Sequence, residues 1–148
     1  MAGLWVVLGV LVAGSAAGLL LRRREGRVKT TGKAPGTVPD LPAAVTGVLD
    51  PERVTLVQIS TTFCAPCRHA RAVLTTLADG TDGLRHVDLD VTQRPEVAQQ
   101  LGVLRTPTTL ALAPDGRELL RVGGVPKAGS LLDALRPHLP NAGMRPGG

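Results

Sequence analysis

The sequence predicts a small α/β domain in which a mixed four-stranded sheet is flanked by helices on both faces. Three observations predict it. Apolar, β-branched runs alternate with segments of helical periodicity along the middle of the 148-residue chain, which is typical of parallel strands joined by crossover helices. Two strand-like runs near the end flank a tight-turn signal, so a hairpin should add an antiparallel edge. Residues 2–21 carry no charge and stand apart from this alternation.

Residues 1–21 are predicted to form a single transmembrane helix that anchors the chain. About 20 apolar residues are needed to cross a bilayer, and this run shows no polar face. Trp5 lies where an interfacial anchor is expected. A cleaved signal peptide is the alternative, but it would carry positive charge before the apolar run, and here the basic residues follow it. By the positive-inside rule we expect a single-pass membrane protein with a cytoplasmic domain; an extracytoplasmic domain stays open.

Residues 22–40 are predicted to be a basic, Pro- and Gly-rich linker. Residues 22–33 contain six basic side chains and one acidic one, whereas residues 34–148 contain eleven of each, so the whole net charge of +5 lies beside the apolar run. Anionic lipid headgroups attract such a cluster. Nucleic-acid binding is not expected, because it would need a basic face on the folded domain. Fully extended, this linker would hold the domain some tens of ångströms from the membrane, at roughly 3 Å per residue.

The candidate domain, residues 41–139, begins with a short helix predicted over residues 41–48. A buried strand is predicted over residues 54–60, which are apolar and β-branched. Beyond the cysteines, apolar residues recur at i, i+3, i+4 and i+7, which indicates one face of a helix. Gly80 follows this pattern as a stop signal.

The second half of the domain alternates in the same way. A strand is predicted over residues 84–91, and Pro95 fits the first turn of a short helix that Gly102 ends. Strands over residues 108–113 and 118–122 flank the Pro-Asp-Gly turn and make a hairpin.

A last helix is expected to begin at Ser130 and to be cut short by Pro137. Residues 140–148 are Pro- and Gly-rich and are predicted to be a flexible tail. The predicted order of elements in the domain is therefore α-β-α-β-α-β-β-α.

Cys64 and Cys67 are the only cysteines, and they lie in the run FCAPCR between a predicted strand and a predicted helix. Two cysteines are too few for a disulfide-rich scaffold or a four-ligand zinc site. The amino terminus of a helix favours the thiolate of Cys64 over its thiol, and Arg68 adds a positive charge nearby. Cys67, one helical turn further on, is placed to resolve a mixed disulfide at Cys64. A pair of inert buried thiols is the structural alternative.

Together these residues resemble the thioredoxin family over residues 41–139. The segments that carry the resemblance are FCAPCR, Arg105-Thr106-Pro107-Thr108, Asp115-Gly116 and Val122-Gly123-Gly124. The resemblance implies a thioredoxin-like fold and a thiol–disulfide oxidoreductase. Such an enzyme uses the redox-active disulfide Cys64–Cys67 and needs no metal or other cofactor.

The resemblance also implies a substrate-binding surface around the cysteines. Pro107 would be cis and would face them, the backbone of Thr106 would pair with an extended substrate segment, and Gly123 would provide a flat surface beside it. The substrate-contacting residues implied are Phe63, Ala65, Pro66, Thr106, Pro107 and Gly123.

Three positions depart from the family's common pattern. Phe63 replaces a Trp and Ala65 replaces a Gly, whereas Gln58 stands where thioredoxins carry a buried Asp that helps to deprotonate the resolving thiol. Because an amide cannot take a proton near neutral pH, the rate of the second step is in question. His69 is predicted to be a solvated helix residue, and His86 a structural one.

The sequence therefore predicts an oxidoreductase that reduces protein disulfides with electrons from an unidentified donor. In a reducing cytoplasm it would act as a reductant; outside the cytoplasm either direction is open. Two other hypotheses remain: transfer of a soft metal ion by the two thiolates with His69, and a non-catalytic interaction module on the same fold.

Overall fold

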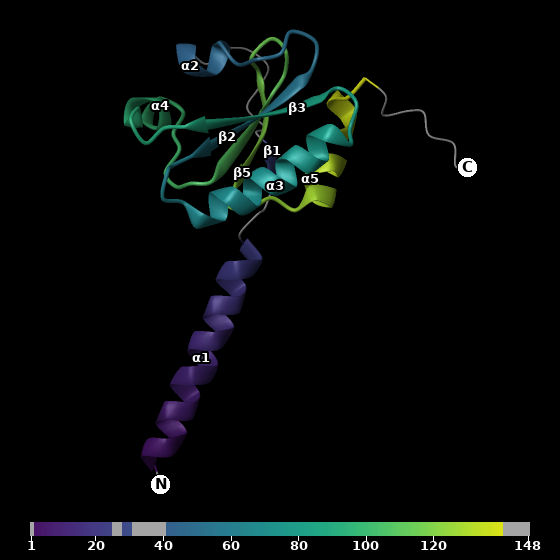
Figure 1. Cartoon of the computed structure of the whole chain (residues 1–148). Coiled ribbons are helices and arrows are strands. Elements are labelled where there is room, and N and C mark those ends of the chain that lie inside the picture. Colours follow the sequence, from purple (N-terminus) through teal and green to yellow (C-terminus); the bar gives the residue numbers. More distant parts are fainter. Residues whose placement is uncertain (1, 25–27, 31–40, 141–148) are drawn as a thin grey trace, which may run out of the picture.

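A computed structural model describes residues 2–24, 28–30 and 41–140. A five-stranded mixed sheet with the order β1-β5-β4-β2-β3 forms its centre, and helices cover both faces (Figure 1). The elements are α1 (Ala2–Arg24), β1 (Val28–Thr30), α2 (Ala43–Thr46), β2 (Val54–Ser60), α3 (Ala65–Asp79), β3 (Leu84–Asp90), α4 (Pro95–Gln100), β4 (Thr108–Leu112), β5 (Glu118–Gly123), α5 (Ala128–Leu135) and the 3-10 helix η1 (Arg136–His138).

The four predicted strands are all present, and β2 spans the predicted residues 54–60. Its seven residues are all buried because the sheet is covered on both sides, which is why apolar side chains occur on both faces of this strand, Val54 and Leu56 on one and Val57 and Ile59 on the other. β2 pairs parallel with β3 and antiparallel with β4, and β4 pairs antiparallel with β5. The predicted mixed sheet with its late hairpin is thus confirmed.

The structure adds one strand that the sequence did not indicate. β1 lies within the segment predicted to be a linker and pairs antiparallel with β5, with Val28 opposite Val122. Three residues are too short for a period-2 pattern, but they complete the hydrogen bonds of an otherwise unpaired sheet edge. Residues 25–27 and 31–40 of the predicted linker, and residues 141–148 of the predicted tail, lie outside the described residues.

Two apolar clusters hold the helices to the sheet. On one face, Leu74 of α3 and Leu131 and Leu135 of α5 pack against the alternate side chains of β2, β4 and β5 that include Leu56. On the other face, Val45 of α2 and Val97 of α4 pack against the intervening side chains of β2 and β4. A strand directs successive side chains to opposite faces, so β2 contributes to both clusters.

The N-terminal helix α1 contains a stretch of 19 residues, Gly3–Leu21, with a mean hydropathy of 2.3 and no residue buried against the domain. It is long and apolar enough to cross a membrane, although a signal sequence would meet the same criteria. The helix continues three residues beyond the predicted anchor, to Arg24.

Candidate active site

The two cysteines lie where β2 gives way to α3, and they form a disulfide with an S–S distance of 2.00 Å and a Cα–Cα distance of 5.2 Å. Cys64 is the N-cap residue of α3, and the backbone N–H of Cys67 donates to its carbonyl oxygen at 3.2 Å. Pro66 occupies the first turn, where a missing N–H leaves no helical hydrogen bond unmade. Cys64 is half-buried, whereas Cys67 is only 2% exposed. Cys64 is therefore the sulfur that a substrate can reach.

The loop before Cys64 is braced against the neighbouring strand. Thr62 donates its backbone N–H to Thr92 Oγ1 at 2.8 Å and its hydroxyl to Asp90 Oδ2 at 3.2 Å. Hydrogen bonds from the Thr92 hydroxyl and backbone hold the pKa of Asp90 below its usual range. These contacts fix the loop while Phe63 points outward, 97% exposed. The predicted apolar residue before Cys64 is thus presented to solvent.

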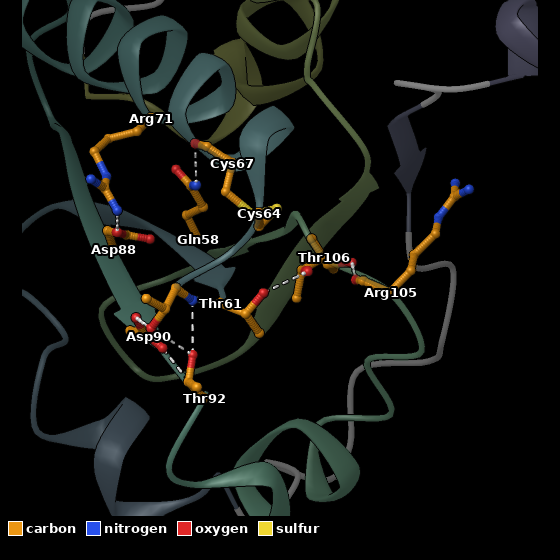
Figure 2. Close-up of a disulfide and its surroundings, with 12 residues drawn as sticks. Gln58, Thr61, Cys64, Cys67, Arg71, Asp88, Asp90, Thr92, Arg105 and Thr106 are labelled. Carbon is orange, nitrogen blue, oxygen red and sulfur yellow. Dashed lines mark hydrogen bonds and ion pairs between the residues drawn. A yellow bond between two sulfur atoms is a disulfide. The ribbon is translucent and has the colours of Figure 1, made fainter.

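A second loop, between α4 and β4, lies beside the cysteines (Figure 2). The Thr106–Pro107 peptide bond is cis, as the resemblance implied. The hydroxyls of Thr106 and Thr61 are 3.4 Å apart, and the carbonyl of Thr61 accepts from the backbone N–H of Cys64 at 3.3 Å. Within the described part of the chain, the backbone N–H and C=O of Thr106 have no hydrogen-bond partner. An extended peptide can pair with such groups as an added strand.

Gly123, for which the resemblance implied a flat surface, lies under the guanidinium of Arg105. A Cβ at position 123 would lie 3.0 Å from Arg105 Nη2. The Arg105 side chain points away from the disulfide in Figure 2. No sequence pattern indicated this contact, because it depends on the register of β4 and β5 and not on spacing along the chain.

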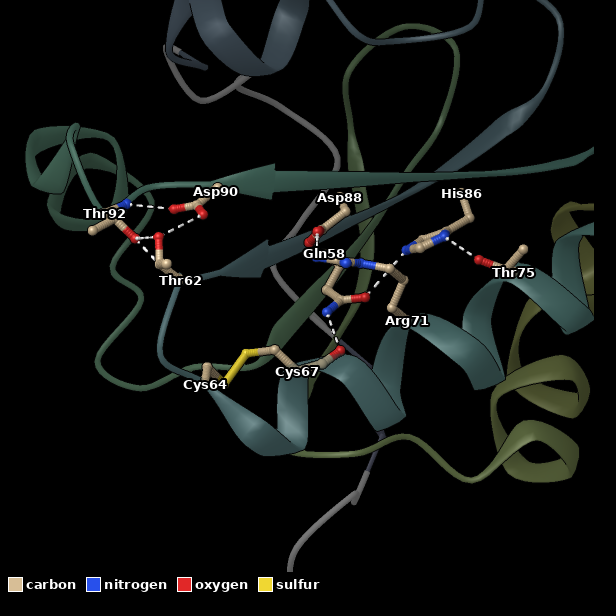
Figure 3. A network of polar contacts seen from close by, with 10 residues as sticks. All are labelled: Gln58, Thr62, Cys64, Cys67, Arg71, Thr75, His86, Asp88, Asp90 and Thr92. Atoms are coloured by element: carbon tan, nitrogen blue, oxygen red, sulfur yellow. Dashed lines mark hydrogen bonds and ion pairs between the residues drawn. A yellow bond between two sulfur atoms is a disulfide. The ribbon is translucent and has the colours of Figure 1, made fainter.

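Behind the disulfide, the buried Gln58 connects α3 to β3 (Figure 3). Its Nε2 donates to the Cys67 carbonyl at 2.9 Å, and its Oε1 lies 3.2 Å from His86 Nε2. Because Oε1 can only accept, His86 Nε2 carries the proton, and His86 Nδ1 accepts from the Thr75 hydroxyl at 3.1 Å. Burial lowers the pKa of His86, and Asp88 partly opposes this effect. His86, predicted to be structural, is thus the partner that orients Gln58.

The site residues predicted from sequence lie mainly in two segments, one at the cysteines and one between α4 and β4. Phe63, Ala65 and Pro66 surround the disulfide in sequence and are exposed, and Thr106 and Pro107 come to the same end of the sheet through the α4–β4 loop. His69 is exposed on α3, as expected.

No group of three or more His, Cys, Asp and Glu side chains placed to hold a metal ion occurs among residues 2–24, 28–30 and 41–140, so that part of the chain offers no support for soft-metal transfer.

Comparisons with known proteins agree with this geometry. Residues 45–137 match the family model described as Thioredoxin. The chain is 34% identical to thioredoxin from Mycobacterium tuberculosis over 97 residues, which cover 65% of this chain and 83% of that protein. It is 30% identical to thioredoxin H2 from Arabidopsis thaliana over 80 residues, 54% of this chain and 59% of that protein's length. The crystal structure of thioredoxin NaTrxh from Nicotiana alata, 30% identical, aligns with a TM-score of 0.52 over 60% of this chain and 75% of that chain.

Proposed function

Because the chain belongs to the thioredoxin family and is a thiol–disulfide oxidoreductase, we propose that it reduces protein disulfides, with Cys64 as the attacking thiolate and Cys67 as the resolving thiol. The observation that carries the proposal is the difference in solvent exposure between the two disulfide-bonded cysteines. Only Cys64 is accessible, and it caps the amino terminus of α3, where unpaired N–H groups stabilise a negative charge.

In the first step, the thiolate of Cys64 attacks one sulfur of the substrate disulfide. A Cys64–substrate mixed disulfide forms, and the other substrate sulfur leaves as a thiolate. The cis Thr106–Pro107 loop is proposed to hold the substrate, with the free backbone groups of Thr106 pairing to an extended segment. Phe63, Ala65 and Pro66 would contact the segment on the other side of the disulfide. Gly123, which lies beneath Arg105, would provide a flat surface beside the substrate segment.

In the second step, Cys67 loses its proton and attacks Cys64 Sγ. The Cys64–Cys67 disulfide forms, the second substrate sulfur leaves as a thiolate, and the substrate has gained two electrons. The structure has the oxidised pair that results. A donor dithiol must then return the domain to its reduced form.

We further propose that α1 anchors the protein in a membrane. Its length and apolar composition support this. The basic residues that follow Leu21 favour a cytoplasmic domain by the positive-inside rule, and a reducing compartment agrees with the reducing direction. An extracytoplasmic domain would leave the direction of electron flow to the local redox poise.

Trapping with cysteine variants tests the two roles. Cys67→Ser leaves the attacking sulfur but removes the resolving one, so it should accumulate mixed disulfides that appear on a gel as bands sensitive to reductant. Cys64→Ser is the matched control and should trap nothing above background. Equal trapping by the two variants would contradict the assigned roles. A reduction potential of about −270 mV would support the reducing direction, whereas one of about −120 mV would indicate an oxidant.

A further inference from the structure

The N-terminal helix joins the domain through a very short connection. Only residues 25–27 separate Arg24, the last residue of α1, from Val28, the first residue of β1. Consecutive Cα atoms are 3.8 Å apart, so the Cα atoms of Arg24 and Val28 are at most about 15 Å apart. β1 is hydrogen-bonded into the sheet. The sheet is therefore tied to α1 at Val28, and the longer segment of residues 31–40 does not extend this connection.

The point of attachment lies in the same row of the sheet as the base of the active site. Val28 is opposite Val122, Val122 is opposite Thr109, and Thr109 is opposite Gln58. Neighbouring strands are about 4.8 Å apart, so Val28 lies about 14 Å from Gln58 across three strand spacings. Gln58 in turn bonds the carbonyl of Cys67 at 2.9 Å.

The direction of β1 sets which end of the domain is tied down. β1 is antiparallel to β5, so the chain before Val28 leaves at the end of the sheet where β5 finishes with Gly123. At that same end β4 begins and β2 delivers the chain to Cys64. In Figure 1, α1 accordingly extends from the side of the domain on which α3 begins.

Arginines without an ion pair gather at one end of the domain, which also contains the carboxylates Asp90 and Glu96. Nine arginines lie within residues 41–140, and six of them form ion pairs with carboxylates. Among the described residues, the three arginines without such a partner are Arg68, Arg94 and Arg105. Arg68 is in the first turn of α3, Arg94 follows the end of β3, and Arg105 precedes the cis peptide bond. All three lie at the cysteine end, where anionic headgroups would attract them.

The same end also presents apolar side chains. Outside α1, Phe63 and Leu104 are the large hydrophobic residues that the described chain exposes, at 97% and 98%. Phe63 precedes Cys64, and Leu104 lies on the loop that carries Pro107. Two exposed apolar residues on the two loops beside the disulfide fit contact with an apolar segment of a substrate.

We propose that the cysteine end of the domain faces the membrane that α1 enters, and that its substrates are disulfides held close to that membrane surface in other membrane proteins. This rests on the proposed function and on α1 as a membrane span. The short connection keeps Cys64 within about 40 Å of Arg24. If residues 22–40 were instead a free linker, its fully extended length of about 60 Å would let Cys64 move that much further from the membrane. The substrate class follows from reach and orientation, and it holds for either side of the membrane.

The test compares disulfides displayed at two heights. The full-length protein, reduced beforehand and freed of reductant, is reconstituted in vesicles of phosphatidylcholine and phosphatidylglycerol with a transmembrane peptide that carries a fluorophore in disulfide linkage. A helical spacer sets the disulfide about 20 Å or about 90 Å above the bilayer, at about 1.5 Å per residue. The expected result is release of the fluorophore at least about tenfold faster from the near position.

Two insertions of the same Gly/Ser segment, about 60 residues long, form a matched pair. Placed between Gly26 and Arg27, ahead of β1, the segment has a root-mean-square length of about 45 Å and should bring the two rates within about threefold. Placed between Gly36 and Thr37, after β1, it leaves the connection to α1 unchanged and should preserve the full difference. Soluble insulin, whose disulfides all variants should reduce at equal rates, reports that each variant is folded and active.

Equal rates at both heights for the wild-type protein would overturn the inference, as would equal effects of the two insertions. Failure of the protein to float with the vesicles would overturn it as well. Failure to reduce insulin would instead overturn the proposed function, so the two failures are distinguishable.

Discussion

Replacement of Gln58 by Glu tests whether the buried network behind the disulfide has the polarity that its contacts indicate. Gln58 is fully buried and uses both ends of its amide, donating to the Cys67 carbonyl and accepting from His86. A neutral carboxyl group can repeat both bonds, since its O–H donates and its carbonyl accepts. An ionised carboxylate would place an acceptor against the Cys67 carbonyl at the position where Nε2 now lies 2.9 Å away.

The ionised form of the introduced carboxyl group is therefore disfavoured by burial and by this contact, and both raise its pKa above the ordinary glutamate value of about 4.3. A folded-state pKa above the unfolded one means that stability is full below about pH 4.3 and is lost as the pH rises toward the folded value. The loss approaches about 1.4 kcal/mol for each unit of difference, so a folded pKa of about 7 would cost about 3.3 kcal/mol at pH 7, where the group is half ionised, and about 3.7 kcal/mol at higher pH. That is a large part of a typical stability of about 5–15 kcal/mol.

Pulse proteolysis in urea measures this on the full-length protein in detergent between about pH 4.5 and 7.5, because it scores the folded domain without separating it from α1. Gln58→Glu should lose stability steadily as the pH rises. Addition of His86→Gln should steepen the loss, since it removes the group that could become a counter-ion to the new carboxylate. Gln93→Glu, at an exposed position, is the matched control and should follow the wild type. If the stability of Gln58→Glu depended on pH as little as that of the control, position 58 could not be a site that is buried from water and faces the Cys67 carbonyl.

Three further predictions use the same assay, with the pH range extended below about pH 3.8 for Asp50. Burial lowers the pKa of His86, so the neutral ring is favoured in the folded state. The contribution of His86 to the stability of the wild-type domain should therefore be full above about pH 6.5 and be lost as the pH falls below that value. His86→Gln should remove this dependence of stability on pH. The pKa of Asp50 is lowered first by a hydrogen bond from the Glu52 backbone N–H and then by the Arg53 guanidinium, so Asp50→Asn should destabilise the protein at neutral pH and flatten the loss of stability below about pH 3.8. Thr109 Oγ1 is buried without a hydrogen-bond partner in the described structure, so Thr109→Val should raise stability by about 1 kcal/mol, and a loss would show that the hydroxyl has a partner.

Periodicity was sufficient for most of the fold because the main helices and strands of the domain contribute regularly spaced apolar side chains to one or both of two clusters. The burial of every residue in β2 and the one-sided pattern of α3 are direct records of that packing. The helix after Pro95 ends at a glycine as expected, and Gly102 has a φ of 62°, a conformation that a residue without Cβ adopts at low cost. β1 was missed because three residues carry no periodic signal, and their pairing depends on an edge of β5 that is remote in sequence.

The candidate site was predictable in its chemistry but only partly in its surroundings. Cys64, Cys67 and the cis Pro107 stand in short local segments, so sequence alone indicated them. The contact between Gln58 and His86 joins positions 28 residues apart, and only the register of β2 against β3 brings them together. Sequence singled out Gln58 as a departure but could not name its partner. No sequence pattern singled out Leu104, because its proposed contact with substrate rests on its exposure in the folded domain.

The short tether and the buried amide act on different steps, and kinetics can separate them. Formation of the mixed disulfide at Cys64 requires encounter with the substrate, so the height of the disulfide above the membrane should change its rate. Resolution by Cys67 is intramolecular, so height should leave it unchanged. Gln58 lies behind Cys67, not beside the substrate loops, and a carboxylate in its place can take the proton that an amide cannot. Gln58→Glu should therefore speed the decay of the mixed disulfide at the higher end of the pH range without changing its formation. Rapid acid quenching, with gel separation of the mixed disulfide, measures both phases. A change in formation rate with this substitution would mean that the side chain at this position also shapes the Cys64 surface, because the two sites would then be coupled through α3.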